Sequence, residues 1–176
     1  MRTLRAGGVV AYPTEAVFGL GCDPFDRAAV YRLLAIKRRP VTKGLIVVAS
    51  SPLQLAALLA PLTAAQRKLL SASWPGPNTW VLPNRRLFPA WITGGKDTIA
   101  VRVSAHPVVH ALCDAFGGAL VSTSANLSGH LPARTALAVR AQFGDAIDYL
   151  MPGDVGKLQR PTQIRDLATG QVLRPS

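Results

Sequence analysis

Short apolar runs of strand length alternate with longer amphipathic stretches along most of the chain. The short runs are continuous, which is typical of buried strands. We expect strands at residues 9–12, 44–49, 79–82, 98–103 and 119–121, and shorter strand-like pieces at 147–150 and around Ile164 and Val172. The segment 13–23 is expected to be a loop, because Pro13 ends the first strand and glycines follow at 19 and 21.

Amphipathic stretches predict helices between these strands. The clearest covers residues 27–36, where Ala28, Val30, Leu33 and Leu34 form an apolar stripe. Further helices are expected at 52–59, 63–71, 107–116 and 135–143. Strands and helices mix without a regular strand–helix–strand period. We therefore expect an α/β fold in a single domain, 1–176, with a twisted mixed sheet flanked by helices.

Composition narrows the class of protein. The chain has 176 residues, of which 49% are hydrophobic and 16% charged, a balance that excludes a disordered protein and suits one buried core. The 20 Lys and Arg residues outnumber the 9 Asp and Glu residues, which gives a net charge of +11. Such a charge attracts phosphorylated ligands or nucleic acid. A basic surface that serves solubility alone is the alternative explanation.

Several kinds of site and segment are not indicated. Cys22 and Cys113 lack the CxxC spacing of zinc and redox sites, so we expect buried free thiols in a reducing compartment. His106 and His110 share a helical face but lack the glutamate of an HExxH motif, and we expect no metal site there. No uncharged apolar run approaches the roughly 20 residues that span a bilayer, and the first residues lack the apolar core of a signal peptide. We therefore expect a cytoplasmic protein with no membrane contact.

The run from Ser122 to Gly129 is the strongest candidate for a binding site. It places hydroxyl and amide side chains directly after the apolar residues 119–121, and the end of a strand is where a rigid sheet presents hydrogen-bond partners to a ligand. The run contains no acid, base or thiol, and its serines lack the GxSxG setting of a hydrolase. It favours binding of an oxygen-rich ligand over nucleophilic attack.

A second candidate is the basic cluster Lys37-Arg38-Arg39, with Lys43 shortly after it. Cations packed so closely repel one another unless an anion such as a triphosphate binds among them. A solvated basic helix end, favoured by the helix dipole, is the alternative. The polar turn at 13–21 has glycines but is neither GxxxxGK[ST] nor GxGxxG, which argues against a P-loop NTPase and a Rossmann dehydrogenase.

Five motifs occur in order along the chain. They are Tyr12-Pro-Thr-Glu-Ala-Val-Phe-Gly-Leu-Gly21, Lys37-Arg-Arg-Pro40, Trp74-Pro-Gly-Pro77, Ala100-Val-Arg-Val103 and Ser122-Thr-Ser-Ala-Asn-Leu-Ser-Gly129. Together they resemble the YrdC/Sua5 family, most closely its short bacterial form with a single domain. The match runs from about Gly8 to Arg174. The ordered set is far more specific than any one motif.

The resemblance implies an open, twisted sheet curving around a large basic cavity, and a nucleotidyltransferase that makes L-threonylcarbamoyladenylate and pyrophosphate from L-threonine, bicarbonate and ATP. Mg²⁺ would accompany the ATP, with no structural metal in the protein. The product would serve threonylcarbamoyladenosine (t6A) formation at adenosine 37 of tRNAs that read ANN codons, with transfer by partner proteins of the TsaB, TsaD and TsaE type.

Two other functional classes stay open at this point. One is a nonenzymatic RNA-binding or ribosome-associated module, in which direct contact with tRNA would rest on the basic surface. The other is a carbamoyl-handling domain like that of hydrogenase maturation proteins, whose acylphosphatase-like and zinc-finger segments are missing from this sequence.

The resemblance also assigns roles to individual residues. The catalytic pair falls on Lys37 and Arg39. The ATP-binding residues fall on Lys37, Arg39, Ser124, Asn126 and Arg134, and the threonine-binding residues on Thr14, Arg102, Ser122, Thr123 and Thr162. The Arg102 fork would take the carboxylate of threonine. No residue is assigned as a general base.

This sequence differs from the family pattern at its start and at its end. Its members have about a helix of residues before the first strand, whereas here that strand begins at Val9, so we expect a truncated or misassigned start. There is also no C-terminal extension of the Sua5 type. Its absence marks the short form and is expected to leave the cavity more open.

Overall fold

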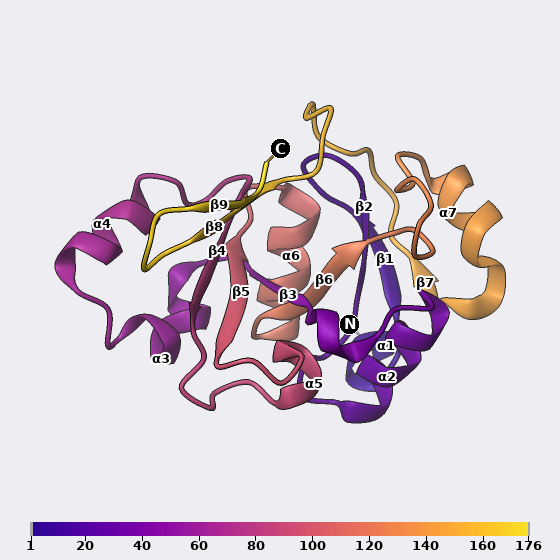
Figure 1. Cartoon of the computed structure of the whole chain (residues 1–176). Coiled ribbons are helices and arrows are strands. Elements are labelled where there is room, and N and C mark those ends of the chain that lie inside the picture. The colour runs from indigo at the N-terminus through magenta and orange to yellow at the C-terminus, as the bar shows by residue number, and fades with distance from the viewer. Residues whose placement is uncertain (1, 176) are drawn as a thin grey trace.

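The structure, a computed structural model, describes residues 2–175 of the chain. Its centre is a nine-stranded sheet with the strand order β7-β1-β2-β6-β3-β5-β4-β8-β9 (Figure 1). The strands are β1 (Val10–Pro13), β2 (Phe18–Gly21), β3 (Ile46–Ala49), β4 (Asn78–Pro83), β5 (Thr98–Val103), β6 (Leu120–Ser124), β7 (Tyr149–Leu150), β8 (Gln163–Asp166) and β9 (Val172–Arg174). The pairs β1–β7, β3–β5 and β4–β8 are parallel, and the other neighbours are antiparallel. The predicted mixed α/β sheet is confirmed.

Helices and short 3-10 turns connect the strands. They are α1 (Arg2–Arg5), α2 (Arg27–Ile36), η1 (Val41–Lys43), η2 (Pro52–Leu55), α3 (Ala56–Leu59), α4 (Ala64–Ser71), α5 (Ala90–Thr93), α6 (Pro107–Phe116), α7 (Ala136–Phe143) and η3 (Gly144–Ala146). Every helix that the sequence predicts is present, although 52–59 is divided between η2 and α3. The sequence pattern predicts neither α1 nor α5. Between residues 2 and 175, no helix combines the length and the apolarity that crossing a membrane requires.

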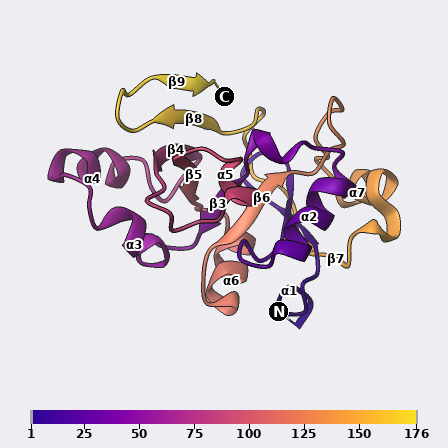
Figure 2. The same cartoon turned by 60° about the horizontal axis from the view of Figure 1, so that its bottom comes forward.

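The sheet has a buried apolar cluster on each face, because successive residues of a strand point to opposite faces. On β1, Ala11 belongs to the larger cluster, whereas Val10 and Tyr12 belong to the smaller one. Helix α2 packs its apolar stripe into the larger cluster, and α1 and α6 pack against the smaller. Figure 2 shows α1 and α6 together below the sheet. The sheet is thereby held as a rigid support between helices.

The prediction that residues 13–23 form a loop is wrong, since 18–21 is strand β2, paired antiparallel with β1. Its glycines serve close packing. A Cβ on Gly21 would lie 2.3 Å from the carbonyl oxygen of Val121 and 2.8 Å from the ring of Tyr12. No other residue fits that approach without displacing the backbone of β6.

Strand β6 is longer than the sequence pattern predicts. Ser122, Thr123 and Ser124 belong to the strand, and the register pairs Ser124 with Gly19 on one side and Ser122 with Ile46 on the other. The prediction that the polar run begins as a loop is therefore wrong for these three residues. Backbone pairing with both neighbouring strands fixes where their side chains point.

Other residues that stand out in the sequence have structural roles. Cys22 and Cys113 are buried free thiols, as predicted. His106 caps α6, because its Nδ1 accepts a hydrogen bond from the backbone N–H of Val108 at 3.3 Å. Trp80 is buried in the core. None of these residues lines the site that the polar motifs form.

Candidate substrate-binding site

A cavity of about 370 Å³ collects residues from strands in both halves of the sheet. On β5, Thr98, Ala100 and Arg102 are alternate residues and therefore share one face, and all of them border the cavity. The register continues this row, since Ala100 pairs with Ile46 of β3, and Ile46 pairs with Ser122 of β6. Side chains distant in the sequence are thus brought to one place by strand pairing.

Most of the residues that the family resemblance assigns to substrates border this cavity. They are Thr14, Arg39, Arg102, Ser122, Thr123, Ser124 and Thr162. The other assigned residues, Lys37, Asn126 and Arg134, are not part of the lining. Their contacts instead hold segments that build its walls.

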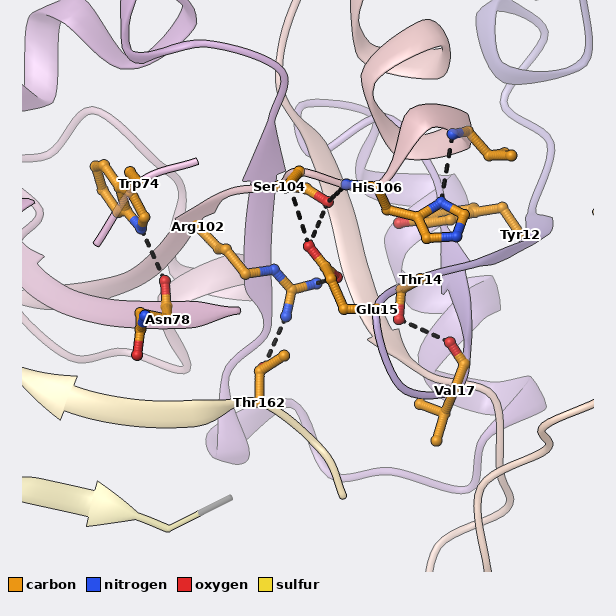
Figure 3. Close-up of polar contacts among 12 residues, drawn as sticks. Tyr12, Thr14, Glu15, Val17, Trp74, Asn78, Arg102, Ser104, His106 and Thr162 are labelled. Atoms are coloured by element: carbon orange, nitrogen blue, oxygen red, sulfur yellow. Dashed lines mark hydrogen bonds and ion pairs between the residues drawn. The ribbon is translucent and has the colours of Figure 1, made fainter. Parts of the chain in front are cut away.

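Arg102 lies between two partners, Glu15 and Thr162 (Figure 3). It is 5% exposed, and its Nη1 donates a hydrogen bond to Oγ1 of Thr162 at 2.7 Å. Its Nη2 lies 3.6 Å from Oε2 of Glu15. The guanidinium is therefore oriented before any ligand binds, which reduces the conformational entropy that a carboxylate ligand would have to overcome.

Glu15 is the buried acid behind Arg102. Its Oε1 accepts hydrogen bonds from Oγ of Ser104 at 2.6 Å and from the backbone N–H of Ala105 at 3.3 Å. Within the described residues, its Oε2 has no hydrogen-bond partner. Burial alone would raise the pKa of the Glu15 carboxyl, but the Arg102 guanidinium and the Ser104 hydroxyl together bring that pKa below its ordinary value. Glu15 is therefore ionised and fixed.

A first prediction concerns the stability that this carboxylate provides. Because the pKa of Glu15 is lower in the folded protein than its ordinary 4.5, its stabilising effect is complete above that value and is lost as the pH falls through the lowered one. Glu15→Gln should reduce the free energy of unfolding by roughly 1–3 kcal/mol at neutral pH, and the difference from wild type should shrink below about pH 4. Denaturant unfolding at both pH values measures it.

The exposed Arg32–Asp148 pair offers a matched control. These side chains are 2.5 Å apart but 42% and 35% exposed, so Asp148→Asn should change stability much less at neutral pH. If the free energies of unfolding of wild type and Glu15→Gln differ equally at neutral and acid pH, the charge of Glu15 is not the stabilising feature.

Residues 151–161, which follow β7 and are called the strap below, cover the turn between β1 and β2. The backbone N–H of Gly156 donates to the carbonyl of Thr14 at 2.9 Å, and that of Leu158 donates to the carbonyl of Glu15 at 3.2 Å. Arg134 holds the strap from outside, because its Nη1 donates to the carbonyls of Leu158 and Gln159, each at 3.1 Å. The strap leads directly to Thr162 in the cavity wall.

Lys37 lies beneath the end of β6. It is 2% exposed, and its ammonium donates to the carbonyl of Ser124 and, at 2.8 Å, to that of Asn126. The same turn is tied by the Ser124 hydroxyl, which donates to Oδ1 of Asn126 at 2.5 Å. Burial, with a smaller effect of Arg39, lowers the pKa of Lys37 to about 8. Lys37 thus braces the turn that places Ser124 at the cavity.

All charged residues of the lining are cations, namely Arg39, Lys43, Lys96, Arg102 and Arg174. Within residues 2–175, only Arg102 among them has an ion-pair partner. Nη2 of Arg39 donates to the carbonyl of Gly44 at 2.9 Å, and its Nε has no hydrogen-bond partner in the part of the chain that the structure describes. The same part of the chain contains no cluster of three or more His, Cys, Asp or Glu residues that could hold a metal ion. The cavity is suited to a multiply charged anion.

Glu15, Lys96 and Arg174 are the members of this site to which the sequence reasoning assigns no role. Glu15 carries a usable signal, because it is the one acid within the motif from Tyr12 to Gly21. Lys96 and Arg174 lie outside the assigned positions. Lys96 precedes β5 and Arg174 lies on β9, and the pairing of β5 with β4, β4 with β8 and β8 with β9 brings them to the same cavity as the other cations.

Sequence comparison places relatives along the whole chain. The Sua5/YciO/YrdC family model, described as telomere recombination, matches residues 2–176. Threonylcarbamoyl-AMP synthase of Halorhodospira halophila is 61% identical over 171 residues, which cover 97% of this chain and 90% of that protein. The protein of the same name from Pseudomonas aeruginosa PAO1 is 53% identical over 175 residues, which cover 99% and 94%.

Solved structures share the fold. Sua5 of P. abyssi complexed with L-threonine superimposes with a TM-score of 0.92 at 35% identity, covering 99% of this chain and 52% of that one. This chain thus spans about half the length of that Sua5 chain. E. coli YciO superimposes with a TM-score of 0.87 at 27% identity, covering 98% and 85%. By a family model that spans it and relatives more than half identical to it, this chain belongs to the Sua5/YciO/YrdC family.

Proposed function

We propose that this protein is a threonylcarbamoyl-AMP synthase, which joins L-threonine, bicarbonate and ATP into L-threonylcarbamoyladenylate and releases pyrophosphate. Relatives at 61% and 53% identity carry this name. The observation that carries the proposal is the cavity itself, where Arg102, fixed by Thr162 and Glu15, borders the same space as Arg39 and Ser124. One cavity thereby offers a place for a carboxylate beside a place for phosphates.

The residues divide into two subsites in this proposal. Thr14, Arg102, Ser122, Thr123 and Thr162 form the threonine subsite, in which Arg102 takes the carboxylate. Arg39, Ser124, Asn126, Arg134 and Lys37 form the nucleotide subsite. Arg39 acts from the cavity wall, whereas Lys37, Asn126 and Arg134 act through the segments that they hold. The catalytic cation of this proposal is Arg39, and Lys37 is a positioning residue that acts through the turn that it braces.

The reaction needs positioning and charge stabilisation more than a nucleophilic side chain. The threonine amine adds to the carbon of bicarbonate with loss of water, and an oxygen of the resulting carbamate attacks the α-phosphorus while pyrophosphate leaves. A carbamate is labile in water, so a walled cavity that holds it beside ATP favours the second step. Cations of the lining offset the negative charge that develops at phosphorus.

Mg²⁺ enters this proposal as part of the ATP substrate. The cavity lining among residues 2–175 includes no carboxylate, so the phosphate oxygens of ATP and water would hold the ion. A hydroxyl such as that of Ser124 is the kind of protein oxygen that the lining could add. We further propose that the chain works as one domain in the cytoplasm, supplying threonylcarbamoyladenylate for t6A formation on tRNA by proteins of the TsaB, TsaD and TsaE type.

The proposal predicts a strict requirement for three substrates. The purified chain should release pyrophosphate only when ATP, L-threonine and bicarbonate are all present, because the attacking carbamate forms from two of them. A coupled pyrophosphate assay with each substrate omitted in turn measures this. Turnover that persists without threonine would exclude the synthase. Salt-sensitive tRNA binding without any turnover would instead support the RNA-binding module.

A further inference from the structure

His106 lies directly before helix α6, close to the residues that hold Arg102 (Figure 3). Its side chain is buried and does not border the cavity. Nδ1 accepts the hydrogen bond from the backbone N–H of Val108 that caps α6. In a neutral imidazole the proton then lies on Nε2, which donates to the carbonyl oxygen of Asp154 at 3.1 Å. The imidazole therefore joins the start of α6 to the strap.

The start of α6 is also connected to one of the two partners of Arg102. Oγ of Ser104 accepts a hydrogen bond from the backbone N–H of His106 at 3.1 Å and donates one to Oε1 of Glu15 at 2.6 Å. Figure 3 shows Ser104 between these two residues. The other carboxylate oxygen of Glu15 lies 3.6 Å from Nη2 of Arg102. The position of α6 thus bears on how Glu15 faces the guanidinium.

The strap lies tightly against the turn that carries Glu15. The backbone N–H of Gly156 donates to the carbonyl of Thr14 at 2.9 Å. A Cβ on Gly156 would lie 2.6 Å from the carbonyl oxygen of Glu15 and 3.0 Å from its Cα, so a larger residue would displace backbone there. The strap then continues to Thr162, whose hydroxyl is the other partner of Arg102. The seat of the strap therefore sets where Thr162 lies.

We propose that His106 is a positioning residue for the threonine subsite, which fastens the strap to α6 and so keeps both partners of Arg102 in place. The inference rests on the proposed function, since it needs threonine bound at Arg102. His106 acts through its bond to Asp154 and not through contact with a substrate. Without that bond the strap shifts on the turn beneath it, and the guanidinium loses the fixed orientation that favours a carboxylate.

Two substitutions separate the two bonds of the imidazole. His106→Asn keeps an oxygen near the position of Nδ1, so it still caps α6, but its short amide does not reach the strap. His106→Gln places its amide near the position of Nε2, so it still donates to Asp154, but glutamine is a poor cap. A residue that only caps the helix is replaced well by asparagine, whereas a residue that fastens the strap is replaced better by glutamine.

Steady-state kinetics with ATP and bicarbonate saturating give the first result. His106→Asn should raise KM for threonine by about 10-fold and change kcat by less than about threefold, because the loss is in binding. His106→Gln should keep both values within about threefold of wild type. Its thermal midpoint should fall by about 2–4 °C, because the cap is lost.

His110 is a matched control on the same helix. Its Nδ1 lies 2.9 Å from Oδ2 of Asp114 and its side chain is 51% exposed. His110→Asn should therefore leave KM for threonine unchanged. Wild-type KM in His106→Asn would overturn the proposal. An equal rise in KM in His106→Asn and His106→Gln would also overturn it, because the strap bond would then not be the feature that matters.

Gly156→Ala tests the strap directly. Its added Cβ pushes the strap off the Glu15 turn, so KM for threonine should rise as in His106→Asn. Because both changes act on the same segment, the double variant should lose little more than the worse single variant. Losses that multiply would show that His106 and the strap act independently, which contradicts the proposal.

A readout without turnover separates this inference from the proposed function. A wild-type protein that fails the three-substrate test would contradict the synthase alone. The link from His106 to the strap is then judged by hydrogen exchange of the amides of Gly156 and Leu158, which donate to the turn at Thr14 and Glu15. These amides should exchange about 10-fold faster in His106→Asn than in wild type or His110→Asn. Unchanged exchange in His106→Asn would show that His106 does not hold the strap.

Discussion

Arg102→Ala is expected to weaken L-threonine binding by about 100-fold or more, while the affinity for ATP stays within about threefold of wild type. Among the lining cations, Arg102 is the one held by side chains on two sides, by Thr162 at 2.7 Å and Glu15 at 3.6 Å. A fixed fork pairs with a carboxylate at little entropic cost, so its loss removes both charge and orientation. Calorimetric titration with each substrate alone measures the two affinities.

Two controls separate binding from folding. Arg102→Ala leaves the buried Glu15 carboxylate without its ion pair, which lowers stability. The double variant with Glu15→Gln should regain part of the free energy of unfolding without regaining threonine affinity. Threoninol, which lacks the carboxylate, should bind wild type much more weakly than threonine, and Arg102→Ala should bind both alike. If Arg102→Ala still prefers threonine by the wild-type factor, another group takes the carboxylate.

Local patterns in the sequence predict the helices and most strands, because periodicity and caps report burial within one element. The wrong predictions, loops at 18–21 and at 122–124, concern residues whose contacts lie far away along the chain. Glycines at 19 and 21 indicate a turn locally, yet Gly21 packs against the backbone of Val121, a hundred residues later. The end of β6 is polar because Ser122 and Ser124 face a cavity, and an apolar strand pattern cannot extend over such residues. Strand order likewise depends on contacts that no local pattern reports.

Residues of the candidate site also fall into those that local motifs reveal and those that depend on distant contacts. Thr14, Arg102 and Ser124 belong to motifs, and strand register brings them to one cavity. Glu15 and Arg174 depend on tertiary structure: Glu15 matters because a guanidinium is buried against it, and Arg174 because a hairpin near the end of the chain folds beside the threonine subsite. Motif reasoning thus finds residues that would touch substrates more readily than residues that orient or complement them.

Lys37 illustrates the difference between a cation near a ligand and a cation that shapes its site. Its position in a basic cluster suggests phosphate binding, but its ammonium faces the carbonyls of Ser124 and Asn126 and is 2% exposed. Arg39, two residues later, borders the cavity instead. Lys37 is the C-cap residue of helix α2, directly after Ile36, so its side chain links this helix to the end of β6. The contribution of Lys37 to nucleotide binding should therefore come through this turn.

Lys37→Met is expected to weaken ATP binding by about 10-fold, to leave threonine binding unchanged, and to reduce the free energy of unfolding by roughly 1–3 kcal/mol. Methionine fills a similar volume but donates no hydrogen bond, so the carbonyls of Ser124 and Asn126 lose the hydrogen bonds from Lys37 and the turn loosens. Calorimetry and denaturant unfolding measure the three effects. Arg38→Gln, at an exposed neighbour that does not border the cavity, is the control and should alter none of them.

The pH dependence of ATP binding separates a bracing role from direct pairing with phosphate. Burial lowers the pKa of Lys37 to about 8, and a neutral amine still donates two hydrogen bonds. A brace therefore survives deprotonation, and the wild-type affinity for ATP should stay nearly constant from about pH 7 to about pH 9. Because the folded pKa lies below the ordinary 10.5, wild type should also gain stability over Lys37→Met as the pH rises between these two pKa values. A wild-type affinity that falls through pH 8 to that of Lys37→Met would assign Lys37 to direct contact with phosphate.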